Sequence, residues 1–141
     1  MQDPLDMLRQ INATAEFNRW CGIEVVAADK GSVVLALQWR KELGQYAGSL
    51  HAGLIATLID TACGFAAAGQ VLASTFTVNC LRPAVGDHFL ARARVIKPGK
   101  KQIFTACDLF AVSADGEKRV AKVKSHFEED LRHACHEGES C

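Results

Sequence analysis

QYAGSLHAGLIATLIDTACG, residues 45–64, is a largely apolar segment that carries one carboxylate, Asp60. Its length and composition predict a helix buried at the centre of a soluble domain. A membrane span is disfavoured, because Asp60 would cost about 3 kcal/mol at the centre of a bilayer. An isolated charge in a buried helix costs several kcal/mol, so it must be paired, neutralised or used. Asp60 is therefore the first candidate functional residue.

The residues just before this helix form a second candidate group. If the helix begins near His51, the backbone N–H groups of Ala52 and Gly53 are free donors at its positive end, which favours an oxyanion. The small side chains of these two residues would let a substrate approach the backbone. The alternative interpretation is that they only permit close packing of the helix end.

The sequence on either side of this helix predicts the remaining helix and strands. Asp3-Pro4 starts a short amphipathic helix within about residues 1–20, because a capping acid precedes a proline at the first turn. The alternating and β-branched patterns then predict a hairpin and four further strands, at residues 22–39, 72–81, 89–97, 102–112 and 119–127. Strand runs separated by one helix favour an antiparallel α+β fold.

Composition bounds the class of protein. The 141 residues are expected to form a single domain, 1–141, ending in a flexible tail at about 129–141. Sixteen basic and sixteen acidic side chains cancel, so no global field favours nucleic acid. The N-terminus lacks the basic start and apolar run of a secretory signal, so a cytoplasmic location without membrane attachment is expected.

The six cysteines include no CxxC pair and are expected to be reduced, mostly buried thiols. Cys63, one turn after Asp60, is interpreted as packing rather than as a nucleophile. A soft-metal site in the tail is a minor alternative, formed by His133, Cys135, His136 and Cys141. No metal or organic cofactor is expected.

Gln45, His51, Ala52-Gly53, Asp60 and the later segment LRPAVGD, residues 81–87, resemble the hotdog-fold acyl-CoA thioesterases, in particular the phenylacetic-acid-degradation-type (PaaI-like) branch. The resemblance covers about residues 17–127 and includes the element order. It implies an antiparallel sheet wrapped around a long central helix. It also implies an acyl-CoA substrate, with coenzyme A as part of that substrate rather than a cofactor.

The resemblance also implies roles for individual residues. Asp60 would be the catalytic carboxylate, as general base or nucleophile, and the Ala52 N–H would polarise the thioester carbonyl. Gln45 would assist, and His51 would help to shape the site. The family usually has His-Gly-Gly where this chain has His-Ala-Gly, and alanine still provides a main-chain N–H.

Further residues are expected around the substrate. Thr75 is our choice for the hydroxyl that positions water, with Ser74 adjacent to it. Gly53 would line the substrate site. The phosphates of coenzyme A would contact the basic candidates, Arg82, Lys100 and Lys101.

Ala52 and Asp60 are eight residues apart, which is about 12 Å along one helix. A single thioester carbon cannot touch both groups. Catalysis with both therefore needs two chains, which predicts a homodimer with composite sites that could pair further into a tetramer.

Three functions stay open from the sequence. The first is hydrolysis of an aryl or medium- to long-chain acyl-CoA. The second is a hotdog hydratase or dehydratase, and the third is a non-catalytic acyl-CoA-binding protein. For Asp60 itself, the alternative to catalysis is a buried acid that is hydrogen-bonded to helix N–H groups or to a threonine.

Overall fold

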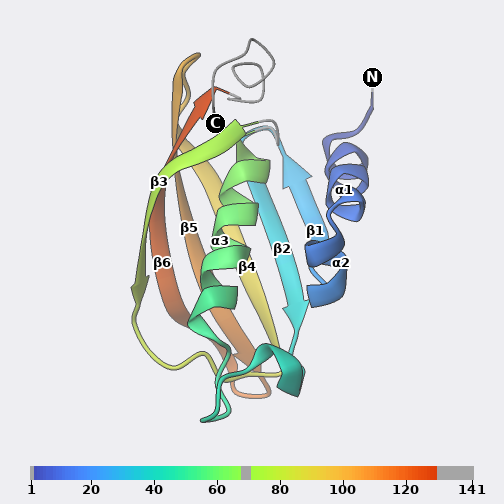
Figure 1. The fold of residues 1–141 in the computed structure, drawn as a ribbon, viewed down its shortest axis with the longest axis vertical. Helices are drawn as coiled ribbons and strands as arrows, with labels where there is room; N and C mark the ends of the chain where they lie inside the picture. Colours follow the sequence, from blue (N-terminus) through green and yellow to red (C-terminus); the bar gives the residue numbers. More distant parts are fainter. Residues whose placement is uncertain (1, 68–70, 130–141) are drawn as a thin grey trace, which may run out of the picture.

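The structure is a computed structural model that describes residues 2–67 and 71–129. An N-terminal pair of helices is followed by a hairpin, a short 3-10 helix, the central helix and four strands (Figure 1). The elements are α1 Pro4–Thr14, α2 Glu16–Cys21, β1 Glu24–Asp29, β2 Ser32–Gln38, η1 Lys41–Leu43, α3 Ala52–Ala66, β3 Val71–Cys80, β4 His88–Lys97, β5 Gln102–Ser113 and β6 Gly116–Glu129.

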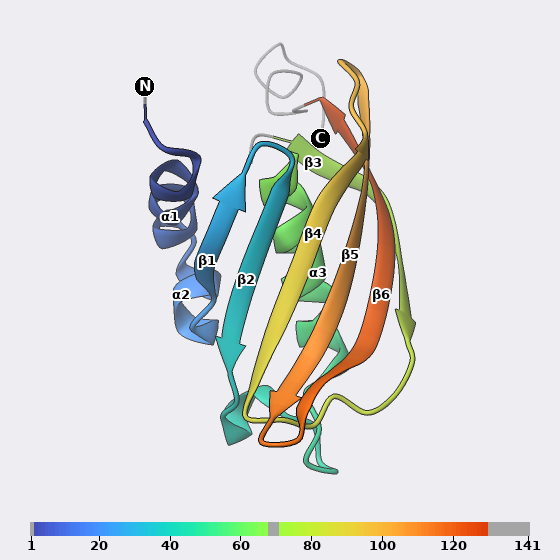
Figure 2. The same ribbon diagram turned by 180° about the vertical axis from the view of Figure 1, so that it is seen from behind.

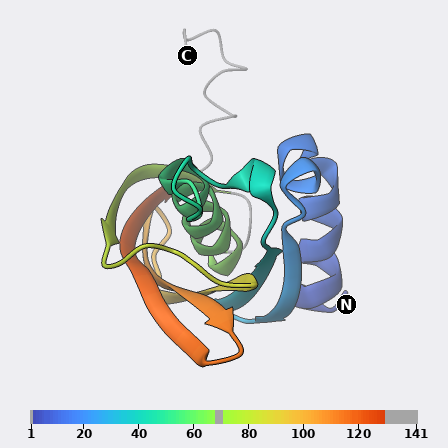
Figure 3. The same ribbon diagram turned by 90° about the horizontal axis from the view of Figure 1, so that it is seen from below.

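The six strands form one antiparallel sheet in the order β1-β2-β4-β5-β6-β3. The sheet curves around α3, which lies against one of its faces, as Figures 2 and 3 show from behind and from below. The core forms where the apolar side of α3 meets the inner face of the strands, and its largest fully buried side chains include Leu35, Leu37, Leu58, Ile59, Phe89 and Leu109. The expected α+β arrangement, with its sheet wrapped around a central helix, is confirmed.

The N-terminal segment differs from the single helix that was predicted. Asp3 caps α1 by accepting from the Leu5 N–H at 3.4 Å, as expected, but the chain becomes extended at Ala15 and a second helix follows. The buried Asn12 explains the break, because its Nδ2 donates to the Ile23 carbonyl at 2.8 Å and its Oδ1 accepts from Asn18 at 2.9 Å. One polar side chain thus joins both helices to the start of the hairpin.

Strand β3 forms one edge of the sheet and contains an irregularity. Ala73 pairs with Phe127 and Thr75 pairs with His126, so Ser74 is an extra residue between two paired positions. Such a bulge changes the direction of the side chains around it. The expected alternation is otherwise present, because Val78 packs against the core while Thr77 and Asn79 lie on the opposite face.

Two other predictions concern the rest of the chain. Among the cysteines that the structure describes, Cys21, Cys63 and Cys107 are buried as expected, whereas Cys80 near the end of β3 is exposed. In the described ranges no helix is long and apolar enough to cross a bilayer. The predicted tail and its possible metal ligands lie outside the described residues.

Candidate active site

The central helix begins at the predicted position, with His51 as its N-cap. The His51 Nδ1 accepts a hydrogen bond from the Gly53 N–H at 2.9 Å, so this N–H is not the free donor that was expected. The next two N–H groups, of Leu54 and Ile55, both donate to the His51 carbonyl. Within residues 2–67 and 71–129 no acceptor is found for the Ala52 N–H, which leaves it available at the positive end of α3.

Gly53 has a steric role as well as a backbone role. A Cβ at this position would lie 3.0 Å from the His51 Nδ1 and 3.3 Å from its Cε1. A Cβ at this position would therefore force the imidazole to shift by a few tenths of an ångström. Gly53 keeps the cap in place, and the cap determines which N–H remains free.

Asp60 lies in the middle of α3 and is partly buried. Burial raises the pKa of its carboxyl above the ordinary aspartate value. Within the described part of the chain it has no hydrogen bond or ion pair, so the alternative of an acid satisfied by helix N–H groups or a threonine finds no support. An unpaired, partly desolvated carboxylate is costly to keep and is typical of a functional site.

Ala52 and Asp60 belong to the same unbroken helix, as the spacing argument required. At 1.5 Å per residue their backbones are about 12 Å apart along the axis. Within one chain, the free N–H and the free carboxylate therefore cannot act on the same carbonyl carbon.

Gln45 begins a tight loop that leads to the helix. Its Nε2 donates to the Ser49 Oγ at 2.7 Å, and its Oε1 accepts from the Ala47 N–H at 2.9 Å. Both ends of the amide are thus used to hold residues 45–49, and Gly48 completes the turn with a φ of 82°. In this chain Gln45 orders the approach to α3.

The two candidate hydroxyls lie on β3 at the bulge. Thr75 falls in register with Thr77 and Asn79, on the face of the sheet that is opposite to α3. Ser74 is the inserted residue and does not follow that alternation. Of the two, Ser74 is the one that the bulge can turn towards the α3 side of the sheet.

The three basic candidates separate to opposite ends of the sheet. Arg82 follows β3 at the end where α3 begins, and Ala84 in the same segment accepts the Leu50 N–H at 2.9 Å. Lys100 and Lys101 lie in the β4–β5 connection at the far end, beyond the last residues of α3 (Figure 1). One chain therefore does not bring all three cations to the helix start.

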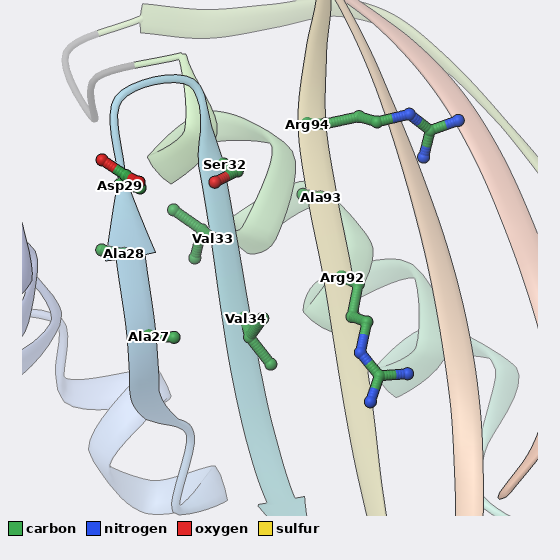
Figure 4. A pocket seen from close by; sticks show the side chains of 9 residues that line it. All are labelled: Ala27, Ala28, Asp29, Ser32, Val33, Val34, Arg92, Ala93 and Arg94. Atoms are coloured by element: carbon green, nitrogen blue, oxygen red, sulfur yellow. The ribbon is translucent and has the colours of Figure 1, made fainter.

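A hollow on the outer face of the sheet lies away from all of these groups (Figure 4). Its cations are engaged: Arg92 makes two hydrogen bonds to Glu117, at 2.9 and 2.8 Å, and Arg94 lies 3.7 Å from Asp108. Both arginines are thus paired with acidic side chains on a solvent-exposed face of the sheet.

Sequence reasoning did not single out a recess beside the helix start. It is lined by residues that include Phe17, Trp20, Leu43, His51, Leu54 and Thr57. The available signal was the pair of aromatic residues three positions apart in EFNRWC, residues 16–21, which places both rings on one side of α2.

Comparison with known proteins identifies the family to which this fold belongs. The family model of the thioesterase superfamily matches residues 47–116, which include the whole of α3. The medium/long-chain acyl-CoA thioesterase YigI of Escherichia coli K12 is 32% identical over 121 residues, covering 82% of this chain and 77% of that protein. The chain belongs to the thioesterase superfamily.

Two further relatives support this assignment. Acyl-coenzyme A thioesterase 13 of Homo sapiens is 28% identical over 111 residues, covering 74% of this chain and 79% of that protein. The crystal structure of a thioesterase family protein from Silicibacter pomeroyi superposes with a TM-score of 0.86 at 29% identity, covering 91% of this chain and 98% of that one. The predicted resemblance to hotdog thioesterases is confirmed at the level of the superfamily.

Proposed function

We propose that this protein hydrolyses an acyl-CoA thioester to a free acid and coenzyme A. The observation that carries the proposal is the unpaired, partly buried carboxylate of Asp60 on the same helix whose start offers the free Ala52 N–H. Relatives named as acyl-CoA thioesterases support the substrate class. The resemblance to the PaaI-like branch favours an aryl or a medium- to long-chain acyl group.

In this mechanism Asp60 is the general base. Its carboxylate takes a proton from water, and the water oxygen forms a bond to the thioester carbonyl carbon. The Ala52 N–H holds the resulting oxyanion, with support from the helix dipole. The C–S bond then breaks, and the proton on Asp60 passes to the coenzyme A thiolate. Direct attack by the carboxylate is the nucleophilic version of the same assignment.

Supporting roles follow from the positions described above. His51 fixes the helix start, and Gly53 leaves room for its ring. Gln45 orders the loop before it. We assign the water-positioning hydroxyl to Ser74 rather than Thr75, because Thr75 lies on the face opposite to α3.

We propose that each site combines the helix start of one subunit with Asp60 of its partner. The 12 Å spacing requires two chains, and the edge strand β3 exposes Leu72 and Phe76, which a partner could cover. Such reciprocal contacts need antiparallel α3 helices. The partner's far end, with its Lys100 and Lys101, would then approach Arg82 and the helix start. A homodimer of this kind, or a pair of such dimers, would act in the cytoplasm.

The test is release of free thiol by the wild type and by Asp60→Ala across acyl-CoAs with aryl, short and long acyl groups. Hydration of enoyl-CoAs is followed in parallel. We expect thiol release by the wild type and a loss of at least about 100-fold in the variant. Hydration without thiol release would identify a hydratase, and binding without turnover would identify an acyl-CoA-binding protein. Full activity in Asp60→Ala would contradict the mechanism.

A further inference from the structure

Helix α2 presents two aromatic side chains to solvent beside the start of α3. The rings of Phe17 and Trp20 are stacked with centroids 6.5 Å apart and planes 8° from parallel, and the two residues are 56% and 57% exposed. Exposed apolar surface is costly to leave in water, so this stacked pair of rings is a candidate contact site. These rings form one wall of the recess described above, which we call the α2–α3 recess.

The wall is held in place before any ligand arrives. The Arg40 guanidinium lies 4.8 Å from the centroid of the Trp20 ring and donates to the carbonyls of Trp20 and Cys21. Gly22, with a φ of 82°, ends α2 directly after these carbonyls. A fixed wall loses little entropy on binding, so its apolar area is available for affinity.

The opposite wall belongs to the catalytic helix. Leu54 and Thr57 line the recess from the first turns of α3, and the Thr57 hydroxyl is already bonded to the Gly53 carbonyl at 2.9 Å. His51 and Gly53, the residues on either side of Ala52 in the chain, also line the recess, so it reaches the helix start. Figure 3 shows η1 between α2 and α3, and Glu42 and Leu43 of this element also line the recess.

We infer that the α2–α3 recess binds the acyl group of the substrate, and that Phe17 and Trp20 are specificity-determining residues. This inference rests on the proposed thioesterase function. The recess has a volume of about 360 Å³, at the lower end of the range for ligand pockets, so it suits an acyl group and not a whole acyl-CoA. Its flat aromatic wall fits a ring or a flexible alkyl chain, whereas an acetyl group would leave most of it unfilled.

The experiment measures kcat/KM for acetyl-, octanoyl- and phenylacetyl-CoA. Phe17→Ala removes part of the wall without touching Arg40, and Thr57→Ile narrows the recess from the other side. In both variants we expect the ratio of kcat/KM for the larger substrates to that for acetyl-CoA to fall at least about tenfold. A larger fall for phenylacetyl-CoA would identify an aryl site, and a larger fall for octanoyl-CoA an alkyl site.

Phe104→Ala is the matched control, because Phe104 is a partly exposed phenylalanine on β5, outside the recess. It should keep the wild-type ratio. An active wild type whose ratio is unchanged in both recess variants would overturn the inference and leave the proposed function standing. So would an equal loss on all substrates together with a change in oligomer size, since the rings would then be a subunit contact. A wild type inactive on every acyl-CoA would overturn both proposals.

Discussion

The His51 imidazole accepts the Gly53 N–H at 2.9 Å, and this single bond leaves the intervening Ala52 N–H as the free donor of the helix start. To accept, Nδ1 must be unprotonated, so a neutral ring carries its proton on Nε2. The cap therefore does two things at once. It stabilises α3 and selects the N–H that can face an oxyanion.

Gly53→Ala should disrupt this arrangement, because the added Cβ would lie 3.0 Å from Nδ1. We expect a loss of about 1 kcal/mol in the free energy of unfolding, typical of a lost N-cap, and a clear fall in kcat. Denaturant unfolding and thiol-release kinetics measure the two effects. Ala52→Gly is the control, since it keeps the N–H and should retain activity. Wild-type stability and kcat in Gly53→Ala would show that the cap has neither role.

Asp60→Asn should make the protein less active but more stable at neutral pH. Burial raises the pKa of this carboxyl in the folded state, so the folded protein binds the proton more tightly than the unfolded chain. The stability of the wild type is therefore greatest when Asp60 is protonated and falls as pH rises through the raised pKa. Asparagine carries no charge, so the variant does not lose stability by keeping an ionised carboxylate partly buried.

Thermal unfolding of both proteins over a range of pH measures this effect. The gain in Tm should be present at pH 7 and vanish below about pH 3.9, the ordinary value for aspartate. In the wild type, kcat should rise with pH as Asp60 loses its proton. This rise should occur at a higher pH than it would for an ordinary aspartate. A Tm gain that persists unchanged in acid would mean that desolvation of Asp60 is not its cause.

Two impaired variants should restore activity when their subunits mix. Gly53→Ala damages the helix start and Asp60→Asn damages the carboxylate, so a heterodimer would keep one intact composite site. Random mixing gives about half heterodimers, and hence about a quarter of wild-type activity. Co-expression with two affinity tags isolates the mixed species for assay. A mixed dimer as inactive as its parents would place both groups in one chain's site.

Ser74→Ala should lower kcat more than Thr75→Val, because Thr75 lies on the face opposite to α3 whereas Ser74 is the inserted residue of the bulge. A water-positioning hydroxyl contributes to the transition state, so the loss should appear in kcat more than in KM. Steady-state kinetics of the two variants side by side decide between them. The reverse order would restore Thr75, the choice made from the sequence.

Arg82→Ala should raise KM for acyl-CoA several-fold with little change in kcat, because phosphate contacts bind substrate and transition state alike. The double variant Lys100→Ala, Lys101→Ala should have a similar effect if the partner supplies those lysines. Raising the salt concentration should shrink both differences. Variants with wild-type KM at low salt would remove these residues from the site.

Local patterns predicted most of the fold, because each element has its own signal. Asp3-Pro4 and the alternating strands each specify their structure within a few residues. The break at Ala15 has no such signal, since Asn12 bonds to Asn18 and Ile23 only once the second helix and the start of the hairpin have folded beside it. The bulge at Ser74 is equally non-local, because it exists only relative to the register of β6.

The candidate site likewise combines features that have a local sequence signal with features that form only in the folded chain. Asp60 and the helix start were predicted because they share one segment and one resemblance. The sequence assigned free donors to both Ala52 and Gly53, whereas the orientation of the His51 ring removes one of them. The α2–α3 recess was not predicted, because Phe17 and Leu54 are far apart in sequence and line the same recess only in the folded chain.

The anchoring of α2 by Arg40 has an evolutionary consequence. The proposed reacting groups reside on α3, while the wall that would select the acyl group is carried by a six-residue helix near the N-terminus. Substitutions in that short helix could retune substrate preference without disturbing the chemical machinery. Divergence among relatives with one shared reaction would then concentrate at the beginning of the chain.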